Sequence, residues 1–376
     1  MFNSKKYWND RYLKGEKSGA GSYNHLAQFK GDVINNFIGK NQIKSIVDYG
    51  VGDGNQLKLI NTENLIYTGI DVSEFIISKC KEEFKNDKTK KFIHSDNIDN
   101  ELKADLVLSC DVIYHLIEDT VYKEYMENLF SMSNKYVIIY AKNEDINHAL
   151  HVKFRKFSSY IENNLPQWKL IKHIPNKYPQ LILGQNNDKT SPSDFYIYEK
   201  VDNAIITMNL GNRIFINYTK PFMIKYSKKT NSKLILIDDN NIKNIIKSFH
   251  NLTEIKIGRN NNKSYLYKVL VIIYYSRIFN KILWVDDTCF IKEICVNLYD
   301  IIEDNYIMAY NEGENKELNS WKNNETHIKN VTGFSINTNN YINSGVVLYS
   351  KYINKILNLD TIIKYKELFN NPYPHQ

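Results

Sequence analysis

The sequence predicts an α/β protein with two domains, residues 1–200 and 201–376. In the first half, apolar runs of strand length alternate with segments of helical spacing, which indicates a parallel sheet covered by helices. A polar stretch (184–194) with Pro192 then precedes one more strand, and a fresh apolar run, NAIITMNL (203–210), starts the pattern again. A chain of 376 residues is too long for one typical core and sufficient for two.

The first strand leads into a glycine-rich loop. Residues 46–55 read IVDYGVGDGN, in which the apolar run carries Asp48. Three glycines follow at every second position: Gly50, Gly52 and Gly54. Such a loop leaves backbone N–H groups open at the start of a following helix. In the dinucleotide-binding fingerprint the third glycine falls three residues after the second, where this chain has Asn55, so that fingerprint fits poorly. A plain tight turn is the alternative.

The second strand ends in a carboxylate. The run LIYTGIDVS (65–73) places Asp71 about 20 residues beyond the loop, where an acidic residue can accept both ribose hydroxyls of a nucleoside. The glycine spacing together with Asp71 resembles motif I and the ribose site of the class I S-adenosylmethionine (SAM)-dependent methyltransferases. The resemblance implies a Rossmann-like fold and SAM as the cofactor.

The resemblance continues in order through the rest of residues 1–200. FIHSDNI (92–98) is a short strand followed by the positions that contact adenine in these enzymes, and ADLVLSCDVIYHL (104–116) resembles motif IV, whose strand end faces the methyl group. The remaining expected elements are helices at 73–86 and 118–131, a fifth strand at 135–142, and an antiparallel pair at 168–174 and 194–200. The implied cofactor residues are Asp48, Gly50, Gly52, Gly54, Asp71, Asp96, Asn97 and Cys110.

One histidine is the candidate catalytic base. His115 lies just past the motif IV strand, where a neutral imidazole could take the proton of an acceptor hydroxyl. A histidine that caps or packs against the following helix is the equal alternative.

Candidate acceptor contacts come from two other segments. HALHVKFRKF (148–157) puts His151 and Arg155 four residues apart, on one face of a helix, where Arg155 could bind a phosphate or sugar. A solvated basic face is the alternative. The segment SGAGSYNHLAQFK (18–30) could cover cofactor and acceptor, or be an ordinary loop. It supplies three candidates: Tyr23, Asn24 and His25. WNDRY (8–12) is expected in an anchoring helix.

The second half carries two adjacent carboxylates. In NKILWVDDTCFI (280–291) an apolar strand ends in Asp286 and Asp287, which are costly to bury unless paired or bound to metal. Hard oxygen ligands suit Mg²⁺ or Mn²⁺ together with a substrate diphosphate. The segment resembles the acidic metal motif of GT-A glycosyltransferases, particularly glycogenin-like enzymes. A simple turn is the alternative.

The flanking segments support this second resemblance. They are a helix-then-strand segment (217–238), a helix bearing Lys268 that leads into the acidic pair, and NSGVVLYSK (343–351). The last implies that Asn343 and Gly345 line the donor site. Two departures count against full activity. Thr288 stands where the family has its second aspartate, and the chain ends at PYPHQ, before a further family segment would be expected.

Composition excludes several other classes. The net charge of +7 is spread over lysines, so nucleic acid is not expected as a partner. The four cysteines have no paired metal spacing and favour a reducing compartment. The N-terminal 15 residues lack the apolar core of a signal peptide, and the longest apolar run (269–275) is too short to span a membrane. We therefore expect a cytoplasmic protein, in the host cytoplasm if the chain is viral.

Together the two halves predict a bifunctional enzyme of glycan biosynthesis. The first would transfer a methyl group from SAM to a sugar hydroxyl of a sugar or glycan acceptor. The second would transfer a sugar from a nucleotide-sugar donor with the help of Mn²⁺ or Mg²⁺. Such fusions resemble glycan-building proteins of large DNA viruses. The alternative is a methyltransferase of a small molecule or RNA joined to a sugar-binding domain without turnover.

Overall fold

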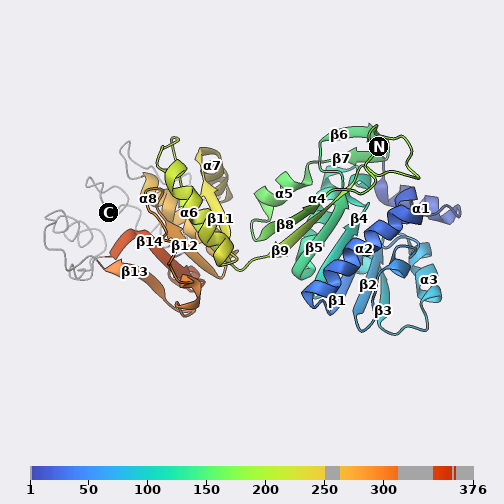
Figure 1. The fold of residues 1–376 in the computed structure, drawn as a ribbon, viewed down its shortest axis with the longest axis horizontal. Helices are drawn as coiled ribbons and strands as arrows, with labels where there is room; N and C mark the ends of the chain where they lie inside the picture. Colours follow the sequence, from blue (N-terminus) through green and yellow to red (C-terminus); the bar gives the residue numbers. More distant parts are fainter. Residues whose placement is uncertain (1, 250–262, 312–341, 358–359, 361–376) are drawn as a thin grey trace. The chain divides into compact units, whose positions relative to one another are not determined.

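The structure is a computed structural model that describes residues 2–249, 263–311, 342–357 and 360 (Figure 1). The chain divides into two compact units, Met1–Lys200 and Val201–Gln376. In both units the apolar runs of the sequence form the strands of a central sheet.

The first unit is built on a seven-stranded sheet in the order β3-β2-β1-β4-β5-β9-β8. The first five strands are parallel, β9 is antiparallel to β5, and β8 is antiparallel to β9. The strands are β1 (Ser45–Tyr49), β2 (Ile66–Asp71), β3 (Lys90–His94), β4 (Ala104–Cys110), β5 (Ser133–Ala141), β8 (Trp168–Ile174) and β9 (Asp194–Lys200). Every strand predicted in this half is confirmed, including the closing antiparallel pair.

Helices cover both faces of this sheet (Figure 1). They are α1 (Ser4–Leu13), α2 (Asn24–Asn41), α3 (Glu74–Glu83), α4 (Asp119–Ser131) and α5 (Phe157–Asn164). Successive residues of β1 point into different cores, because strand side chains alternate between faces. Val47 packs with α4 and α5, and Ile46 packs with α1, α2 and α3. Burial on both faces explains why these strands read as continuous apolar runs.

The helix expected after the glycine loop is absent, and this expectation was wrong. The loop leads instead into a single 3-10 turn, η2 (Leu57–Leu59). Leu57 and Ile60 are both buried. Residues three apart stand above one another in a 3-10 turn, so one such turn buries both side chains.

The helix expected at 148–157 is also corrected. The segment forms a two-stranded antiparallel hairpin, β6 (Ile146–Ala149) with β7 (Val152–Phe154). Val152 and Phe154 are buried on either side of the less buried Lys153, which is the two-residue period of a strand. His151 and Arg155 therefore share no helix face.

A buried ion pair ties α2 to the end of β4. The Lys30 ammonium lies 2.7 Å from Oδ2 of Asp111, and its side chain is only 1% exposed. The hydroxyls of Tyr114 and Ser193 donate to Oδ1 of the same carboxylate, at 2.9 and 3.3 Å. Asp111 itself has a left-handed backbone, with φ of 60°. Because the charges are out of water, the pairing and these hydrogen bonds must offset a large loss of hydration.

The second unit contains a mixed five-stranded sheet in the order β11-β10-β12-β14-β13. Strands β10 (Asn203–Met208), β11 (Lys233–Ile237) and β12 (Lys281–Val285) are parallel, whereas β14 (Ile342–Ser350) runs antiparallel to β12 and to β13 (Ile307–Asn311). The helices are α6 (Ile216–Lys229), α7 (Asp239–Ser248), α8 (Lys263–Ser276) and α10 (Ile353–Ile356). The predicted helix-then-strand segments are confirmed as α6–β11 and α8–β12.

No helix within the described ranges is both long and apolar enough to cross a membrane.

The buried pair generates a stability prediction. Lys30→Met leaves the partly buried Asp111 carboxylate without its cation, so we expect a loss of about 3 kcal/mol in the free energy of unfolding of the first unit, the low end for buried pairs. The double variant with Asp111→Asn, a residue that tolerates the left-handed backbone, should recover more than half of that loss. Denaturant unfolding measures all three proteins. Lys123→Met, which removes a surface pair with Glu127, is the control and should cost less than about 1 kcal/mol. Equal losses from Lys30→Met and Lys123→Met would contradict the prediction.

Candidate functional site

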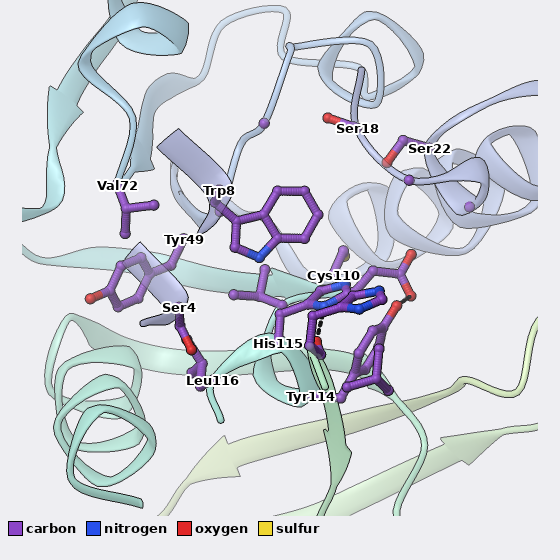
Figure 2. Close-up of a pocket in the computed structure, with 18 of the residues that line it drawn as sticks. Ser4, Trp8, Ser18, Ser22, Tyr49, Val72, Cys110, Tyr114, His115 and Leu116 are labelled. Atoms are coloured by element: carbon purple, nitrogen blue, oxygen red, sulfur yellow. Dashed lines mark hydrogen bonds between the residues drawn. The ribbon is translucent and has the colours of Figure 1, made fainter. Parts of the chain in front are cut away.

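A cavity of about 550 Å³ opens at the carboxyl ends of β1, β2 and β4 (Figure 2). Parallel α/β sheets bind ligands at this edge. Eight of the predicted site residues line it: Asp48, Gly50, Gly52, Asp71, Asp96, Cys110, His115 and His151. Six others of the first unit are not among the lining residues: Tyr23, Asn24, His25, Gly54, Asn97 and Arg155.

The glycine loop approaches its neighbours too closely for side chains. Gly50, Gly52 and Gly54 all have left-handed backbones, with φ of 108°, 57° and 76°. A Cβ at position 50 would lie 2.3 Å from a methyl carbon of Val112, and one at position 52 would lie 2.5 Å from the Ser18 hydroxyl. Gly54 instead packs on Phe84, next to α3. The first two glycines therefore shape the cavity wall, and the third lets the loop pass close to Phe84.

Two buried carboxylates stand at the ends of the neighbouring strands β1 and β2. Asp71 accepts hydrogen bonds from the backbone N–H groups of Gly52 and Ser73, both at 3.0 Å. Asp48 accepts one from the Tyr67 hydroxyl at 2.8 Å. Burial raises the pKa of each carboxyl to about 6. A carboxylate oxygen has room for a second donor, so Asp71 can still receive a ligand hydroxyl.

Helix α1 covers the cavity and was missed as part of the site. Ser4, Lys5, Trp8 and Tyr12 all line the cavity. Two hydrogen bonds hold the helix in place. The Ser4 backbone N–H donates to Glu118 at 2.9 Å, and the Ser73 hydroxyl donates to Asn9 at 3.1 Å. These partners are more than 60 residues away in the sequence, so no local pattern could have revealed the cover.

Residues 18–23 form a second cover over the glycine loop. Asp53 accepts from the Ser18 N–H at 3.0 Å and from the Tyr23 hydroxyl. The Asn55 amide donates to the Ser22 carbonyl at 2.6 Å. Tyr23, predicted to contact the acceptor, is thus bonded to the glycine loop. The carboxylate that organises this contact, Asp53, lies inside the glycine motif itself.

The predicted adenine contacts lie at the exposed edge of the site. Asp96 and Asn97 sit in the 3-10 turn η3 (Ser95–Asn97), and both are exposed. The Lys5 ammonium pairs with Asp96 and holds the pKa of that carboxyl below its usual range. Cys110, at the end of β4, is partly buried, and burial raises the pKa of its thiol, so the sulfur is neutral.

His115 is held in one tautomer by the hairpin. It lies in the 3-10 turn η4 (Ile113–His115), and its Nδ1 is 3.0 Å from the carbonyl oxygen of His151. A carbonyl can only accept, so Nδ1 carries the proton and Nε2 holds the free lone pair. Burial lowers the pKa of the imidazole to about 4, which keeps it neutral near pH 7. Figure 2 shows the Trp8 ring beside His115, with ring centroids 4.7 Å apart.

Three of the other candidate acceptor residues have protein partners: Arg155, His25 and His151. Arg155 donates to the carbonyls of Leu116 and Ile117 and to Asp119, so it holds the turn after His115. His25 has its Nε2 2.8 Å from the carbonyl of Lys189, and Asn24 is the exposed first residue of α2. His151 stacks on Tyr7 at 5.2 Å.

The long connection between β8 and β9 also lines the cavity and was also missed. It contributes polar lining residues: Gln180, Asn187, Thr190 and Ser191. Buried Asn176 anchors its first end by donating to the Tyr140 hydroxyl and to the Ser193 carbonyl, both at 2.7 Å. The polar composition of 184–194 identified a loop, but that composition cannot tell which cavity a loop borders.

In the second unit the two adjacent carboxylates have different surroundings. Asp286 accepts from the Trp284 indole N–H at 2.6 Å and pairs with Lys268 at 3.4 Å. Asp287 is buried and pairs with Arg213 at 3.2 Å. Its Oδ2 has no hydrogen-bond partner among the described residues, and burial raises its pKa.

The predicted donor-site strand lies beside this pair. The Asp286 N–H donates to the Gly345 carbonyl in β14 at 2.7 Å. Asn343 also lies in β14, and its side chain falls outside the described part of the structure. Within the described residues no three His, Cys, Asp or Glu side chains are grouped so that they could hold a metal ion.

Comparison with known proteins identifies the first unit. Residues 47–129 match the family model described as "Methyltransferase domain". No curated protein matches the chain. Similar solved structures include the N-methyltransferase NodS from Bradyrhizobium japonicum with S-adenosyl-L-homocysteine. It is 13% identical, with 53% of this chain and 99% of that chain covered at a TM-score of 0.44.

Another is the magnesium protoporphyrin IX methyltransferase ChlM from Synechocystis with S-adenosyl-L-homocysteine. It is 14% identical, with 52% and 97% covered at a TM-score of 0.40. Because identities and TM-scores are this low, these structures carry no argument about what the chain binds. The family match falls on the glycine loop, Asp71 and the motif IV strand, which line the cavity. The first unit of this chain therefore contains a methyltransferase domain, matched over residues 47–129.

Proposed function

We propose that the cavity of the first unit binds SAM and that this unit methylates a hydroxyl group of a sugar. The observation that carries the proposal is one continuous cavity whose lining includes both Asp71, with the glycine loop, and His115. One end offers a nucleoside site, and the other offers a neutral imidazole and polar side chains. This is the arrangement that methyl transfer to a polar acceptor requires.

The residues present fit the cofactor. A Cβ at position 50 would clash with Val112, and one at position 52 would clash with Ser18, so neither position can carry a side chain. The loop backbone therefore stays uncovered on the cavity side. Asp71 is buried and retains acceptor capacity for ribose hydroxyls. When bound, SAM supplies a methyl group activated by a sulfonium.

The acceptor side fits a neutral polyhydroxyl compound. The Trp8 and Tyr114 rings give apolar surface, and Gln180, Asn187 and Thr190 give amide and hydroxyl groups that can both donate and accept. The buried cation on this side, Lys30, is already neutralised by Asp111. A sugar satisfies such a lining better than an acceptor that carries a net charge.

The protein's own part in catalysis is mostly positioning. Covered by α1, the cavity would hold the two reactants in line and away from water, the larger source of rate. With SAM bound, methyl transfer to the acceptor oxygen would break the carbon–sulfur bond and free the hydroxyl proton, which Nε2 of His115 would accept. Since the pKa of His115 is about 4, its help as a base is modest.

A second candidate function belongs to the second unit. We propose that it binds the diphosphate of a nucleotide sugar through Mn²⁺ or Mg²⁺ and transfers the sugar to a glycan. The supporting observation is the unpartnered, buried oxygen of Asp287 next to Asp286. Magnesium sites often use one or two carboxylates and take their other oxygens from the substrate and water. The competing proposal is a sugar-binding unit without turnover, beside a methyltransferase of a small molecule or RNA.

The cofactor site predicts a pH-dependent affinity. Ribose hydroxyls donate to the charged form of Asp71, so binding lowers a pKa that burial has raised to about 6 and releases a proton. We expect SAM affinity to fall as pH drops below about 6 in the wild type. Asp71→Asn cannot ionise and should bind more weakly by about 1–3 kcal/mol at pH 7, with a flatter pH dependence. Calorimetry measures both. An unchanged affinity and slope in the variant would remove Asp71 from the site.

If His115 is the base, removing it should lower the methylation rate without changing SAM affinity. His115→Ala should slow methylation about 100-fold, the low end for general bases because the imidazole is weakly basic, while SAM affinity stays near wild type. The acid limb due to His115 should lie near pH 4 and not near 6.5. The assay is mass spectrometry of products from SAM and a panel of sugars and glycans. His173→Ala, on β8, is the control and should keep its rate. A fully active His115→Ala would return this residue to a packing role.

The acidic pair predicts cation-dependent donor binding. UDP- or GDP-sugars should raise the melting temperature of the second unit with Mn²⁺ and not with chelator. Asp286→Asn should abolish this shift because the leaving diphosphate loses its cation. Asp300→Asn, an exposed residue of η6 (Leu298–Asp300), is the matched control. Stabilisation of equal size with chelator would show that the carboxylates only form a turn.

A further inference from the structure

The outward face of α6 and the turn before it combines apolar and basic side chains. Phe215 and Tyr218 are exposed, the latter at 61%, and Phe222 continues the same ridge one turn later. The helix carries four lysines and no acidic residue: Lys220, Lys225, Lys228 and Lys229. Its inner face, with Met223 and Tyr226, is buried against the sheet. The outer ridge therefore adds nothing to that core.

The segment 289–296 extends this ridge sideways. The rings of Phe222 and Phe290 are in contact, with centroids 5.4 Å apart. Lys225 pairs with Glu293 at 2.6 Å, and the Tyr226 hydroxyl donates to the Val296 carbonyl at 2.8 Å. The segment thus lies along α6.

Together these residues form one exposed apolar surface. We call it the α6 patch and define it by the exposed Phe215, Tyr218, Phe290, Ile294 and Val296 together with the half-buried Phe222. Ile294 is 85% exposed and Phe290 is 59% exposed. Single exposed apolar residues are ordinary, but a contiguous group of them marks an interaction surface.

Positive charge surrounds the α6 patch. Besides the four lysines of α6, Lys292 is exposed within the neighbouring segment, and Arg213 is bound over the Phe215 ring. Glu293 of the neighbouring segment is paired with Lys225, and the buried Asp287 is paired with Arg213. The surface is therefore complementary to an anionic partner.

We propose that the α6 patch binds the surface of an anionic lipid membrane. Aromatic and aliphatic side chains ringed by lysines suit the boundary between headgroups and acyl chains, where rings insert and ammonium groups meet lipid phosphates. A nucleic acid would use the lysines and the rings but would leave Ile294 and Val296 against water. The lipid surface accounts for both the charged and the aliphatic residues. This inference does not depend on either proposed transfer reaction.

The test is flotation of the full chain with vesicles. Binding is expected to vesicles that mix phosphatidylserine with phosphatidylcholine, not to phosphatidylcholine alone, and to weaken as salt rises. Phe290→Ser with Ile294→Ser should weaken binding at least tenfold. Lys228→Gln and Lys292→Gln should each weaken it about fivefold. Leu150→Ser with Leu181→Ser, two exposed apolar residues of the first unit, is the matched control and should bind like the wild type.

Three results would overturn the proposal. One is equal binding, or none, to the two kinds of vesicle by the wild type, an outcome that needs no variant. Another is full binding by the folded Phe290→Ser/Ile294→Ser protein, with folding checked by circular dichroism. The third is binding of RNA or a glycan through the α6 patch with no binding to vesicles.

Discussion

The buried pair of Lys30 and Asp111 sets the geometry on which the rest of the first unit's site depends. It holds Asp111 in a left-handed conformation directly after β4, so the chain turns there and delivers Val112, Tyr114 and His115 to the cavity. Val112 then lies where a Cβ on residue 50 would fall, and Asp111 Oδ2 lies 2.9 Å from a Cβ built on Gly21. Because of this one turn, a Cβ would clash at both Gly50 and Gly21, which lie in distant segments. The glycine loop and the turn after β4 thus meet in the cavity wall next to this ion pair.

The sequence predicted the sheet well because strand periodicity is local. Each predicted strand from 46 to 200 was confirmed, and Asp71 was placed at its strand end from spacing alone. The Lys30 pair could not be predicted, because an ordinary helical lysine and an aspartate 81 positions away carry no local sign that they meet. The hairpin at 146–154 was misread as a helix because apolar residues two and four positions apart fit both the strand period and the helix period. Only the burial pattern shows that the strand period is used.

The two carboxylates at the ends of β1 and β2 show how packing assigns a role that sequence leaves open. Both are buried, and both have a pKa raised to about 6. The Tyr67 hydroxyl, from the neighbouring strand β2, donates to Asp48, which also lines the cavity. Asp71 receives only backbone donors, from Gly52 and Ser73, which fix its position and leave acceptor capacity facing the cavity. The two carboxylates thus differ in their partners, a side-chain hydroxyl for Asp48 and backbone N–H groups for Asp71.

In the second unit the two carboxylates are adjacent, whereas the GT-A motif that they resemble has them two positions apart. Asp286 directly follows β12, and Asp287 begins the turn after it. Asp286 pairs with Lys268 of α8, whereas Asp287 pairs with Arg213, just before α6. These helices pack on different cores of the sheet. The position two residues after Asp286 holds Thr288, which supplies no carboxylate. A cation bound here, as proposed, would compete with Lys268 for Asp286 and with Arg213 for Asp287.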